Sequence, residues 1–574
     1  MTFLRFVTTL REVERASSRL EMVRLLADAL RDLPPDEAPL AVNLLKGQVA
    51  PEFEGVEFGV AEKEAAKALA LALGRDEVEV VRAVREKGDI GAYAREALPQ
   101  RTGGLSLRHV YDELRAIAED AGPGSQARKR ERLARLVAAA SPEEAALILR
   151  IVTGRLRLGV GDATVLEALA LAFLGDRSKK PLLERAYNLT SDLAYVARLA
   201  LEGEDALRAV KLEVGKPVRM MLAERLAGPE QIMEKLGPHF AEHKYDGERV
   251  QIHYDGERFW VYSRRLENIT HQYPDLLEAL REVQHEPFIL EAEAVVTDPL
   301  TGEMRPFQNV LNRKVKHLTP ELLEKYPIKG FVFELLYDRG EALIERPYRE
   351  RRERIERWFR PHERLELSVK RYVETTEELV RFFDESIEAG CEGLVCKKPD
   401  GEYEAGKRGF KWVKYKRGIA GKLSDTLDLV IVGAWLGRGR RAGAYGSLLA
   451  AAYNSDEDRF ETLTKIGSGF SDADLNEVLP RRLGPYRRQE RHPRVWSLQE
   501  PDVWFDPVLV VEVEAQEITL SPGHTCAFGV VQQGRGLALR FPRFVRYRDD
   551  KSPEEATTTR EVVEMYHNQW SQSR

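Results

Sequence analysis

Cysteine is scarce in this chain of 574 residues, which carries only Cys391, Cys396 and Cys526. Three scattered cysteines form neither a paired disulfide framework nor the Cys-x-x-Cys half-site typical of structural zinc, which argues against both. Long apolar runs are also absent, because no stretch approaches the roughly 20 residues that span a bilayer. The N-terminal segment 1–7 lacks the sustained apolar core of a secretion signal. We therefore expect a protein that stays in the cytoplasm and has no membrane role.

The chain also lacks a large excess of charge of one sign. It has 88 basic and 94 acidic residues, a formal net charge of −6, so the molecule as a whole does not indicate a polyanionic partner. The charge is unevenly distributed, however, because residues 407–441 hold ten lysines and arginines against only Asp425 and Asp428. Such a stripe can face phosphates, although by itself it is more often a solvated surface.

The first region of the chain, residues 1–212, is rich in helix signals. The overall composition is that of a globular protein, and the length predicts roughly three or four domains. Ser18 and Glu21 predict a capping box at the start of one helix. The segment 141–144 (Ser-Pro-Glu-Glu) repeats this pattern, with Gly154 placed to end the second helix. The region is therefore expected to be all-α.

One segment interrupts these helices with arginines and glycines, residues 155–161 (Arg-Leu-Arg-Leu-Gly-Val-Gly). Both its backbone and its guanidinium groups could approach a phosphate. A loop between helices with exposed arginines explains the composition equally well. The sequence leaves these two interpretations open.

Strand patterns begin at about residue 213. Residues 249–254 and 259–262, joined by Asp255-Gly256, predict a β-hairpin with a type I′ turn. A mixed α+β domain is expected over residues 213–420. Its further elements are predicted strands at 288–296, 331–337, 393–397 and 410–416 and a helix at 348–359.

From about residue 425 the predicted strands become short and frequent. Five of them within some 130 to 150 residues favour a small barrel of the OB-fold type over residues 421–574. Residues 417–422, which are basic and contain glycine, would act as a hinge or as a rigid connection to this barrel. The strands are expected at 429–434, 447–453, 462–466, 508–514 and 537–541.

Lys244 opens the run Lys-Tyr-Asp-Gly-Glu-Arg (residues 244–249), the most informative segment for chemistry. A lysine amine attacks phosphorus only when it is unprotonated, so a catalytic lysine needs burial or neighbouring cations that lower its pKa. Lys414 and Lys416 lie two residues apart on a predicted strand, which would place both on one face. A Lys-x-Asp-Gly-x-Arg pattern arises by chance in roughly one chain of this length in a few hundred.

Two carboxylates, Glu291 and Glu293, alternate on another predicted strand. Side by side on one face they would repel each other, so a shared ribose or cation explains them better than a core does. Phe333 by itself is typical of a core residue. The basic stretch 540–551 by itself is typical of a protected strand edge.

Taken together and in this order, these segments resemble the motifs of the ATP-dependent DNA ligases, which share a superfamily with RNA ligases and mRNA capping enzymes. The resemblance covers essentially the whole chain and implies a helical DNA-binding domain, an adenylation domain and an OB-fold domain. It implies that Lys244 takes AMP in a phosphoramide bond and that Glu242 helps to bind adenine. Arg249 and Arg264 would contact ribose or phosphate.

The resemblance implies roles for the remaining positions as well. Glu392, in the Glu-Gly-x-x-x-Lys pattern of residues 392–397, would help to hold Mg²⁺ together with Glu293. Since the last motif lies more than 250 positions beyond Lys244, the barrel would close over the nucleotide and later swing away. The other implied contacts are Glu293 with ribose, Phe333 stacked on adenine, Lys397 facing the nucleotide, Lys414 and Lys416 on the α-phosphate, and Arg548 and Lys551 on the β- and γ-phosphates.

The resemblance predicts an ATP-dependent DNA ligase that uses ATP and Mg²⁺. Lys244 would attack the α-phosphate of ATP, AMP would pass to the 5′-phosphate at a nick, and the neighbouring 3′-hydroxyl would displace AMP. The helical domain would grip nicked double-stranded DNA through its phosphates with little reading of bases. We expect a monomer that works at the nucleoid, and the use of ADP or GTP stays open.

Three other functions compete with this prediction. An RNA ligase or a capping enzyme shares the lysine motif but usually lacks a helical domain such as residues 1–212. A scaffold that only binds nicks would not need the acidic and cationic positions, and an NAD-dependent ligase would need a zinc module that three cysteines cannot make. Binding to a sliding clamp stays in doubt, because residues 100–105 lack the aromatic pair of a clamp-binding peptide.

Overall fold

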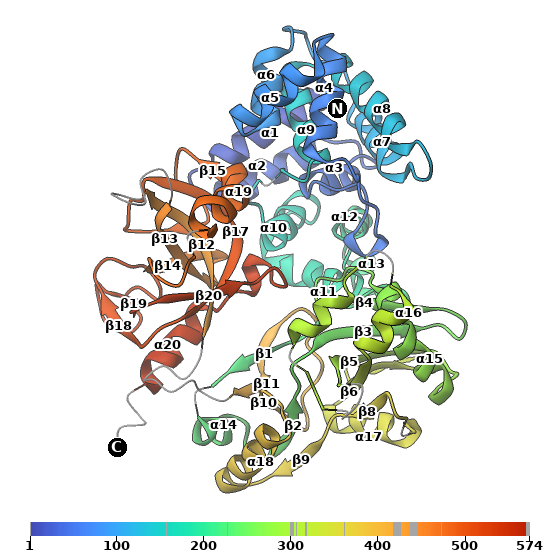
Figure 1. Cartoon of the computed structure of the whole chain (residues 1–574), viewed down its shortest axis with the longest axis vertical. Helices are drawn as coiled ribbons and strands as arrows, with labels where there is room; N and C mark the ends of the chain where they lie inside the picture. Colours follow the sequence, from blue (N-terminus) through green and yellow to red (C-terminus); the bar gives the residue numbers. More distant parts are fainter. Residues whose placement is uncertain are drawn as a thin grey trace.

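Three regions follow one another along the chain and occupy separate parts of the molecule (Figure 1). In this view the helical region (residues 3–208) lies at the top, the central region (222–416) at the bottom and the C-terminal region (427–568) at the left. The computed structural model describes residues 2–156, 158–226, 228–298, 303–305, 307–315, 318–360, 362–416, 426–436, 445–471 and 473–569. The predicted hinge at 417–422 and part of the basic stripe 407–441 lie outside these residues.

The helical region is held together by apolar stripes that its helices turn inward. In α7 (Leu107–Glu119) the buried side chains recur every three or four positions, as the 3.6-residue period of a helix requires. The all-α prediction is therefore confirmed for this region. Its other helices are α1 (Phe3–Arg15), α2 (Arg19–Arg31), α3 (Ala38–Leu45), α4 (Glu62–Leu73), α5 (Glu77–Lys87), α6 (Ile90–Ala97), α8 (Ser125–Ala139), α9 (Pro142–Val152), α10 (Asp162–Phe173), α11 (Lys180–Thr190), α12 (Leu193–Glu202) and α13 (Glu204–Arg208).

The two predicted capping boxes have different outcomes. At α9 both reciprocal hydrogen bonds between Ser141 and Glu144 are present, and Gly154, with φ +66°, follows the end of the helix. At α2 the Ser18 hydroxyl accepts the Glu21 N–H, but the Glu21 carboxylate accepts the N–H of Ser17 at 2.8 Å. The predicted capping box of Ser18 and Glu21 is therefore wrong in its return bond, which goes to the N–H of Ser17 in place of that of Ser18.

The central region contains two sheets. In the first, strands run in the order β1-β11-β10-β2-β9, with α14 (Pro229–Leu236) and α18 (Thr376–Glu388) packed against it. In the second, the order is β4-β3-β5-β6-β7, with β8 beside β6, and α15 (Pro274–Val283) and α17 (Tyr348–Trp358) contact β6. The strands are β1 (Leu222–Arg225), β2 (His239–Lys244), β3 (Glu248–Tyr254), β4 (Phe259–Tyr262), β5 (Phe288–Val296), β6 (Ile328–Asp338), β7 (Glu341–Ala342), β8 (Leu365–Leu367), β9 (Lys370–Val373), β10 (Gly393–Lys397) and β11 (Arg408–Lys416), and a further helix is α16 (Pro320–Lys325).

The predicted hairpin of β3 and β4 exists, but its turn is not of type I′. Tyr254 pairs with Phe259, which leaves a loop of four residues, and of its first two residues only Gly256 has a positive φ. A type I′ turn requires positive φ at both central positions. Here the Asp255 carboxylate instead accepts the N–H groups of Glu257 and Arg258, which stabilises a longer loop.

The C-terminal region is rich in strands, as predicted. Its main sheet has the order β15-β17-β12-β13-β14-β16, with β20 also paired to β17, and β18 pairs with β19. The register of β12 shifts between Ile431 and Gly433 on both of its neighbours, which bends the sheet where Gly433 packs on Pro501. The elements are β12 (Leu427–Leu436), β13 (Tyr445–Asn454), β14 (Arg459–Ile466), α19 (Leu479–Leu483), β15 (Arg487–Arg488), β16 (Val495–Trp496), β17 (Val503–Glu514), β18 (Glu517–Ser521), β19 (Gly536–Arg540), β20 (Arg543–Tyr547) and α20 (Thr559–Asn568).

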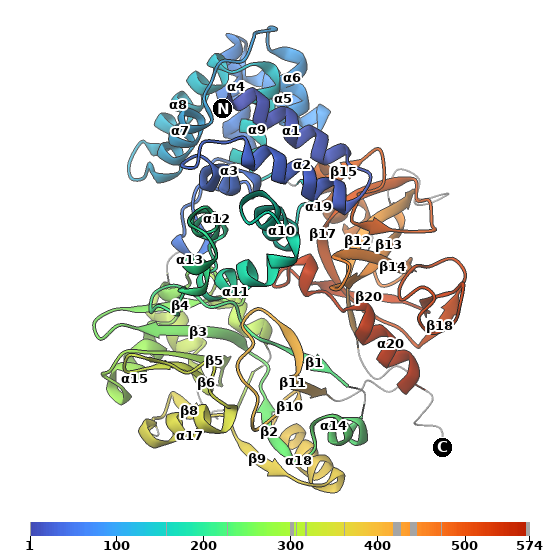
Figure 2. The same ribbon diagram turned by 180° about the vertical axis from the view of Figure 1, so that it is seen from behind.

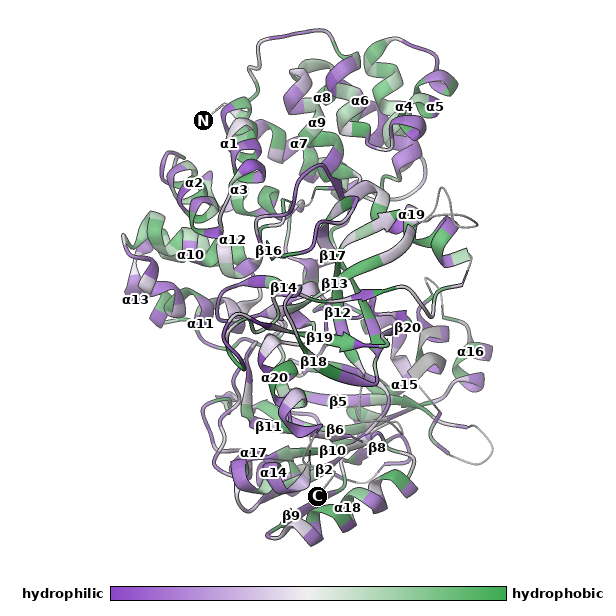
Figure 3. Ribbon diagram, turned by 90° about the vertical axis from the view of Figure 1, so that its left-hand side faces the viewer, coloured by the Kyte–Doolittle hydropathy of each residue, from purple (hydrophilic) through white to green (hydrophobic). Residues whose placement is uncertain are grey.

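The pattern of hydropathy agrees with this arrangement. Figure 3 shows strands β12, β13 and β17 mostly in the hydrophobic colour, whereas α18 carries both colours along its length. Residues such as Leu429, Leu448 and Val511 are buried in the core of the C-terminal region. Among the residues that the structure describes, every helix is too short or too polar to cross a bilayer.

Candidate active site

Three strand ends bring Lys244, Glu392 and Lys416 together. Strand β10 pairs with both β2 and β11, and Gly393 stands opposite Lys244 on one side and Lys416 on the other. The Lys244 ammonium donates to a Glu392 carboxylate oxygen, and the Lys416 Nζ lies 2.8 Å from the same oxygen. The Lys244 side chain is 26% exposed, so it is sheltered beside charged groups and does not project into bulk solvent.

This arrangement corrects the predicted protonation state of Lys244. Burial alone lowers the pKa of Lys244, but the carboxylates of Glu392, Glu293 and Asp246 outweigh it, and the pKa is raised. The cations Lys414 and Lys416, which the sequence placed near such an amine, do not outweigh these carboxylates in the structure. Lys416 contacts the same Glu392 oxygen as Lys244. The positive charge of Lys416 is therefore balanced by the carboxylate that stabilises the Lys244 ammonium.

The two alternating carboxylates of β5 have different surroundings. Glu291 is fully buried and accepts hydrogen bonds from Arg249 at 2.8 Å, Tyr403 at 2.8 Å and Gln251 at 3.1 Å. Its charge is balanced within the protein, so the shared ribose or cation expected for it is not needed. Burial, reinforced by Glu392 and partly offset by Lys244, raises the pKa of Glu293 to about 7.

Three aromatic rings surround the ammonium group of Lys397. Its Nζ lies 5.0 Å from the Phe333 ring centroid, 4.7 Å from that of Tyr348 and 4.6 Å from that of Trp412. The same nitrogen donates to the Phe333 carbonyl oxygen at 2.9 Å and lies 3.1 Å from Glu242 Oε2. Burial lowers the pKa of Lys397. Phe333 is only partly buried and is flanked by cations, which is unusual for a plain core residue.

Arg249, from β3, lies beside two of the same rings. Its guanidinium carbon lies 5.4 Å from the centroids of both Phe333 and Trp412, and its Nη1 donates to the Met221 carbonyl at 2.7 Å. Burial alone lowers the pKa of Arg249, but the Glu291 carboxylate is the main group that outweighs it, and the pKa is raised. The structure therefore brings Glu242, Lys397, Phe333 and Arg249 to one place in the central region.

Residues from the C-terminal region approach the same part of the molecule. Arg264 Nε donates to Glu555 at 2.8 Å, and Arg265 donates to the Lys551 carbonyl oxygen at 3.2 Å. Glu561 of α20 pairs with Arg408 and lies 3.6 Å from Lys414 Nζ. Figure 2 shows α20 beside the end of the sheet formed by β1 and β11.

Arg548 and Lys551, from the last predicted motif, contact an acidic residue of their own C-terminal region. Arg548 lies 2.9 Å from Asp428, and Lys551 donates to the same carboxylate. Burial, with a contribution from the positive charge of Arg264, lowers the pKa of Lys551 to about 8. Burial also holds the pKa of Lys414 well below its usual range, and Lys551 is one of the charges that contribute. The motif thus lies within electrostatic reach of Lys414 and Arg264.

Comparison with known proteins identifies the family. Residues 220–416 match the model described as "ATP dependent DNA ligase domain", residues 2–170 match "DNA ligase N terminus", and residues 441–551 match "ATP dependent DNA ligase C terminal region". The chain is 48% identical over 566 residues to the "Probable DNA ligase" of Aquifex aeolicus (strain VF5), with 97% of each chain covered. The chain belongs to the ATP-dependent DNA ligases. It is also 46% identical to the "DNA ligase" of Sulfophobococcus zilligii over 586 residues, covering 98% of this chain and 96% of that one.

As a member of this family, the ligase seals nicks in DNA at the expense of ATP and with a divalent metal ion, through a lysyl-AMP intermediate. The predictions of family, fold class and reaction are thereby confirmed. The roles of individual residues and the domain boundaries after residues 212 and 420 stay predictions.

Two carboxylates of the ligase fit a magnesium ion. Among the described residues no group of three or more His, Cys, Asp or Glu side chains could hold a metal. Mg²⁺ keeps several waters and needs few protein oxygens, so the two predicted ligands Glu293 and Glu392 are compatible with it. Burial and the negative charges of Glu392 and Asp246 raise the pKa of Glu293, although Lys244 and Arg249 partly offset them.

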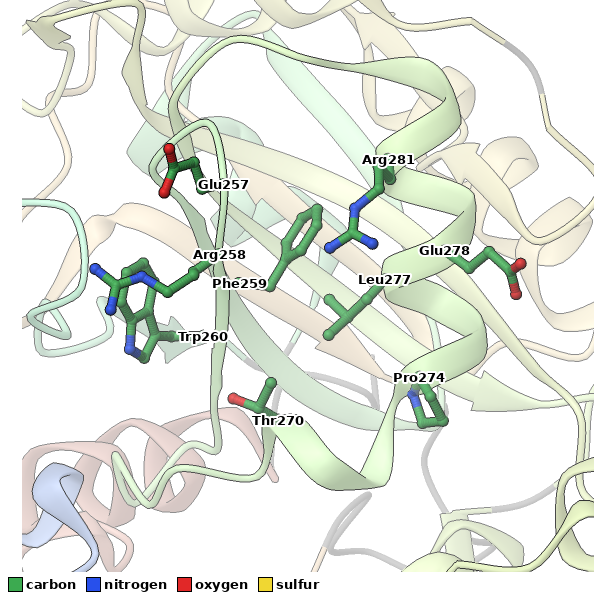
Figure 4. A pocket seen from close by; sticks show the side chains of 9 residues that line it. All are labelled: Glu257, Arg258, Phe259, Trp260, Thr270, Pro274, Leu277, Glu278 and Arg281. Atoms are coloured by element: carbon green, nitrogen blue, oxygen red, sulfur yellow. The ribbon is translucent and has the colours of Figure 1, made fainter.

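A separate concavity of the ligase lies on the outer side of β4 and α15 (Figure 4). Arg281 stands over the Phe259 ring at 5.3 Å, and Arg258 stands over the Trp260 ring at 5.2 Å. Leu277 also lines this concavity and lies near Phe259 and Arg281. None of the predicted site residues lines this concavity.

Several residues of the site have no sequence signal that identified them. Tyr403 bridges the Met221 N–H and the Glu291 carboxylate, and Ser368 and Arg352 contact Glu242 or its neighbours. Each comes from a segment far from Lys244 in sequence, and none stands in a recognisable motif. Glu561 does belong to a recognisable motif, because it forms a capping box with Thr558 at the start of α20.

Proposed function

We propose that Lys244 is the nucleophile of the ligase. The observation that carries the proposal is its sheltered position where β2, β10 and β11 end, with Glu392 and Lys416 against its ammonium group. The other proposed contacts are Glu242 with adenine, Phe333 stacked on the base, Lys397 facing the nucleotide, Arg249 and Arg264 with ribose or phosphate, Glu293 with ribose, Lys414 and Lys416 with the α-phosphate, and Arg548 and Lys551 with the β- and γ-phosphates.

In the first step the Lys244 nitrogen forms a bond to the α-phosphorus of ATP while the bond to pyrophosphate breaks. The amine must lose its proton first, and Glu392 controls this because it contributes most of the charge that raises the pKa of Lys244. Any movement of Glu392 away from the amine lowers that pKa. Mg²⁺, when held by Glu293 and Glu392, supplies charge neutralisation at the phosphate.

The next two steps are displacements at the same phosphorus and at the 5′-phosphate of the nick. The 5′-phosphate oxygen displaces the Lys244 nitrogen, and the 3′-hydroxyl then displaces AMP to form the phosphodiester. Lys414 and Lys416 would stabilise the charge that develops on the equatorial oxygens. Their positions beside each other on β11 suit this role in each step.

The helical region is proposed to bind the duplex, with domain boundaries after residues 212 and 420. Contacts to phosphates would dominate, so binding would weaken steeply with salt and depend little on sequence. We further propose that the ligase works as a monomer on nicked double-stranded DNA at the nucleoid. No segment supports a proposal of contact with a sliding clamp.

The test of the nucleophile is to incubate the protein with Mg²⁺ and ATP and to weigh the intact chain. We expect an adduct of one AMP, which disappears in Lys244→Ala and persists in Lys411→Ala, a lysine of the same sheet that pairs with Glu404. Labelling of the Lys244→Ala chain would refute the assignment.

A nicked duplex added to the labelled protein should discharge the adduct and yield joined DNA. A nicked duplex made only of RNA should leave the adduct in place. A preference for the RNA duplex would favour an RNA ligase instead.

A further inference from the structure

The Glu242 carboxylate is buried and its two oxygens are unequal. Glu242 is 1% exposed. Its Oε2 accepts the Ser368 hydroxyl at 2.6 Å and lies 3.1 Å from Lys397 Nζ. Its Oε1 has no hydrogen-bond partner among the described residues, although Arg352 Nη1 lies 3.6 Å away. One oxygen is therefore committed to the protein and the other is available to a donor.

Arg352 fixes the orientation of the serine that holds Glu242. This arginine comes from α17, is 4% exposed, and donates through Nη1 to the Ser368 hydroxyl at 2.8 Å and through Nη2 to the Ser368 carbonyl at 2.7 Å. The Ser368 N–H donates to the Val332 carbonyl at 2.8 Å. A hydroxyl has only one proton. Because Arg352 occupies an acceptor position of the Ser368 oxygen, that proton is directed to Glu242.

We propose that Arg352 and Ser368 are positioning residues that set the preference of the ligase for a 6-amino purine over a 6-oxo purine. The proposal rests on the proposed contact between Glu242 and the base. By holding Oε2, the pair presents Oε1 as an acceptor with no donor of its own. The 6-amino group of adenine can donate to such an oxygen, whereas the 6-oxo group of guanine would face it with a second acceptor.

The pair would act through repulsion as much as attraction. A buried acceptor left without a donor is costly, so a site of this kind rejects ligands that cannot supply one. A carboxylate free to rotate could instead turn toward the N–H groups of guanine. Holding the carboxylate in one rotamer therefore matters for discrimination more than for binding as such.

The test compares adenylation and guanylylation of the protein with ATP and GTP, measured as kcat/KM for formation of the covalent adduct. In Ser368→Ala we expect the ATP to GTP ratio to fall about tenfold, through a higher KM for ATP and a lower KM for GTP. Ser368→Thr, which keeps the hydroxyl, should restore the ratio. Ser497→Ala, at a buried serine of the C-terminal region, is the matched control and should leave it unchanged.

Further arms separate the ways in which the proposal can fail. Equal losses with both nucleotides in Ser368→Ala, at an unchanged thermal unfolding curve, would indicate a purely structural role and overturn it. If Ser368→Ala does not fold, Ser368→Cys keeps the volume with a weaker donor and should give an intermediate ratio, whereas a wild-type ratio overturns the proposal.

The role of Glu242 is tested independently. If Glu242→Gln lowers the ratio and the Ser368 variants do not, the positioning role fails and the contact with the base survives. If Glu242→Gln keeps the wild-type ratio, the contact between Glu242 and the base is itself wrong. ATP compared with a purine triphosphate that lacks the 6-amino group should show the same about tenfold difference in the wild type, and the Ser368→Ala variant should lose it.

Discussion

Thr164 in α10 and Asp458 at the start of β14 are joined by a buried hydrogen bond of 2.8 Å, from Thr164 Oγ1 to Asp458 Oδ2. Arg494 donates to the same carboxylate at 2.6 Å, and Arg19 lies 3.8 Å from it. The helical and C-terminal regions are thus connected directly, although 294 positions separate the two residues. Polar groups buried together in this way hold a defined orientation, because opening the contact leaves them unpaired.

The loop at residues 155–161 belongs to the same contact. A Cβ added at Gly159 would lie 1.5 Å from His492 Nε2, and one added at Gly161 would lie 2.9 Å from Arg494 Nη1. The described part of the loop therefore packs on the C-terminal region, and Arg155 pairs with Glu62. If this loop also contacts phosphates of DNA, the two regions must first separate.

The first prediction concerns this junction. Thr164→Val keeps the shape of the side chain but removes the donor to Asp458, which should weaken the contact between the two regions. We expect a larger radius of gyration in small-angle X-ray scattering. Thr190→Val, at a buried threonine whose hydroxyl donates within its own helix, is the matched control. An unchanged radius in Thr164→Val would show that other contacts suffice to keep the junction closed.

The second prediction concerns the charge on Lys244. Glu392→Gln removes the carboxylate that contributes most to the raised pKa of Lys244 and leaves the Lys416 ammonium unbalanced nearby. The pKa of Lys244 should therefore fall. The measurement is the pH dependence of acylation of Lys244 by an amine-reactive reagent, followed by peptide mass spectrometry.

The midpoint of that reaction should move to lower pH in Glu392→Gln. It should stay in place in Glu402→Gln, whose carboxylate pairs with Lys411. Coincident midpoints for the wild type and Glu392→Gln would contradict the pairing seen in the structure.

The third prediction concerns the pH dependence of stability. The pKa of Glu293 is about 7 in the folded protein and about 4.5 in an unfolded chain, so the folded state binds the proton more tightly. Stability should therefore fall as pH rises from about 4.5 to about 7, and the loss, about 3 kcal/mol, should be complete above that range.

Glu293→Gln removes this loss because glutamine resembles the protonated acid. Its melting temperature should exceed that of the wild type at pH 8, and the difference should shrink at pH 5. Glu402→Gln serves as the control in thermal unfolding followed by circular dichroism. The idea fails if the difference between Glu293→Gln and the wild type is the same at both pH values.

Local patterns in the sequence predicted several strands, although not β2, the strand that ends at Lys244. The bounds of β5 and β10 agree with the predicted segments 288–296 and 393–397, because each is a short apolar run bounded by turn residues or charges. Five strands of the C-terminal region were also predicted. The short strands β15, β16, β18 and β20 were not, since two to five residues at the edge of a sheet carry too little pattern.

Features that depend on distant partners could not be predicted in the same way. The protonation of Lys244 depends on Glu392, which lies 148 positions away, and on which carboxylate oxygen Lys416 shares. The sequence predicted that all three residues lie in one site. It did not predict that their net effect raises the pKa of Lys244. The contacts of Ser368 and Arg352 with Glu242 likewise could not be predicted, because they form only when the chain folds and brings distant segments to β2.

The fourth prediction concerns the buried ion pair of Arg351 and Glu334. Arg351 is fully buried and donates to both oxygens of Glu334, at 2.8 and 2.9 Å, and to the Gly401 carbonyl at 3.0 Å. Glu334 follows Phe333 on β6. Burial alone raises the pKa of Glu334, but Arg351 outweighs it and the pKa is lowered.

Arg351→Met should leave Glu334 as an unpaired buried charge and lower the stability of the central region by about 3 to 5 kcal/mol. The double variant Arg351→Met with Glu334→Leu should be less destabilised than Arg351→Met alone, since replacing both partners removes the uncompensated charge. Urea unfolding of the wild type, both single variants and the double variant gives the coupling energy directly. Two buried side chains that share two hydrogen bonds should be strongly coupled. Additive losses in the single and double variants would therefore contradict this pairing.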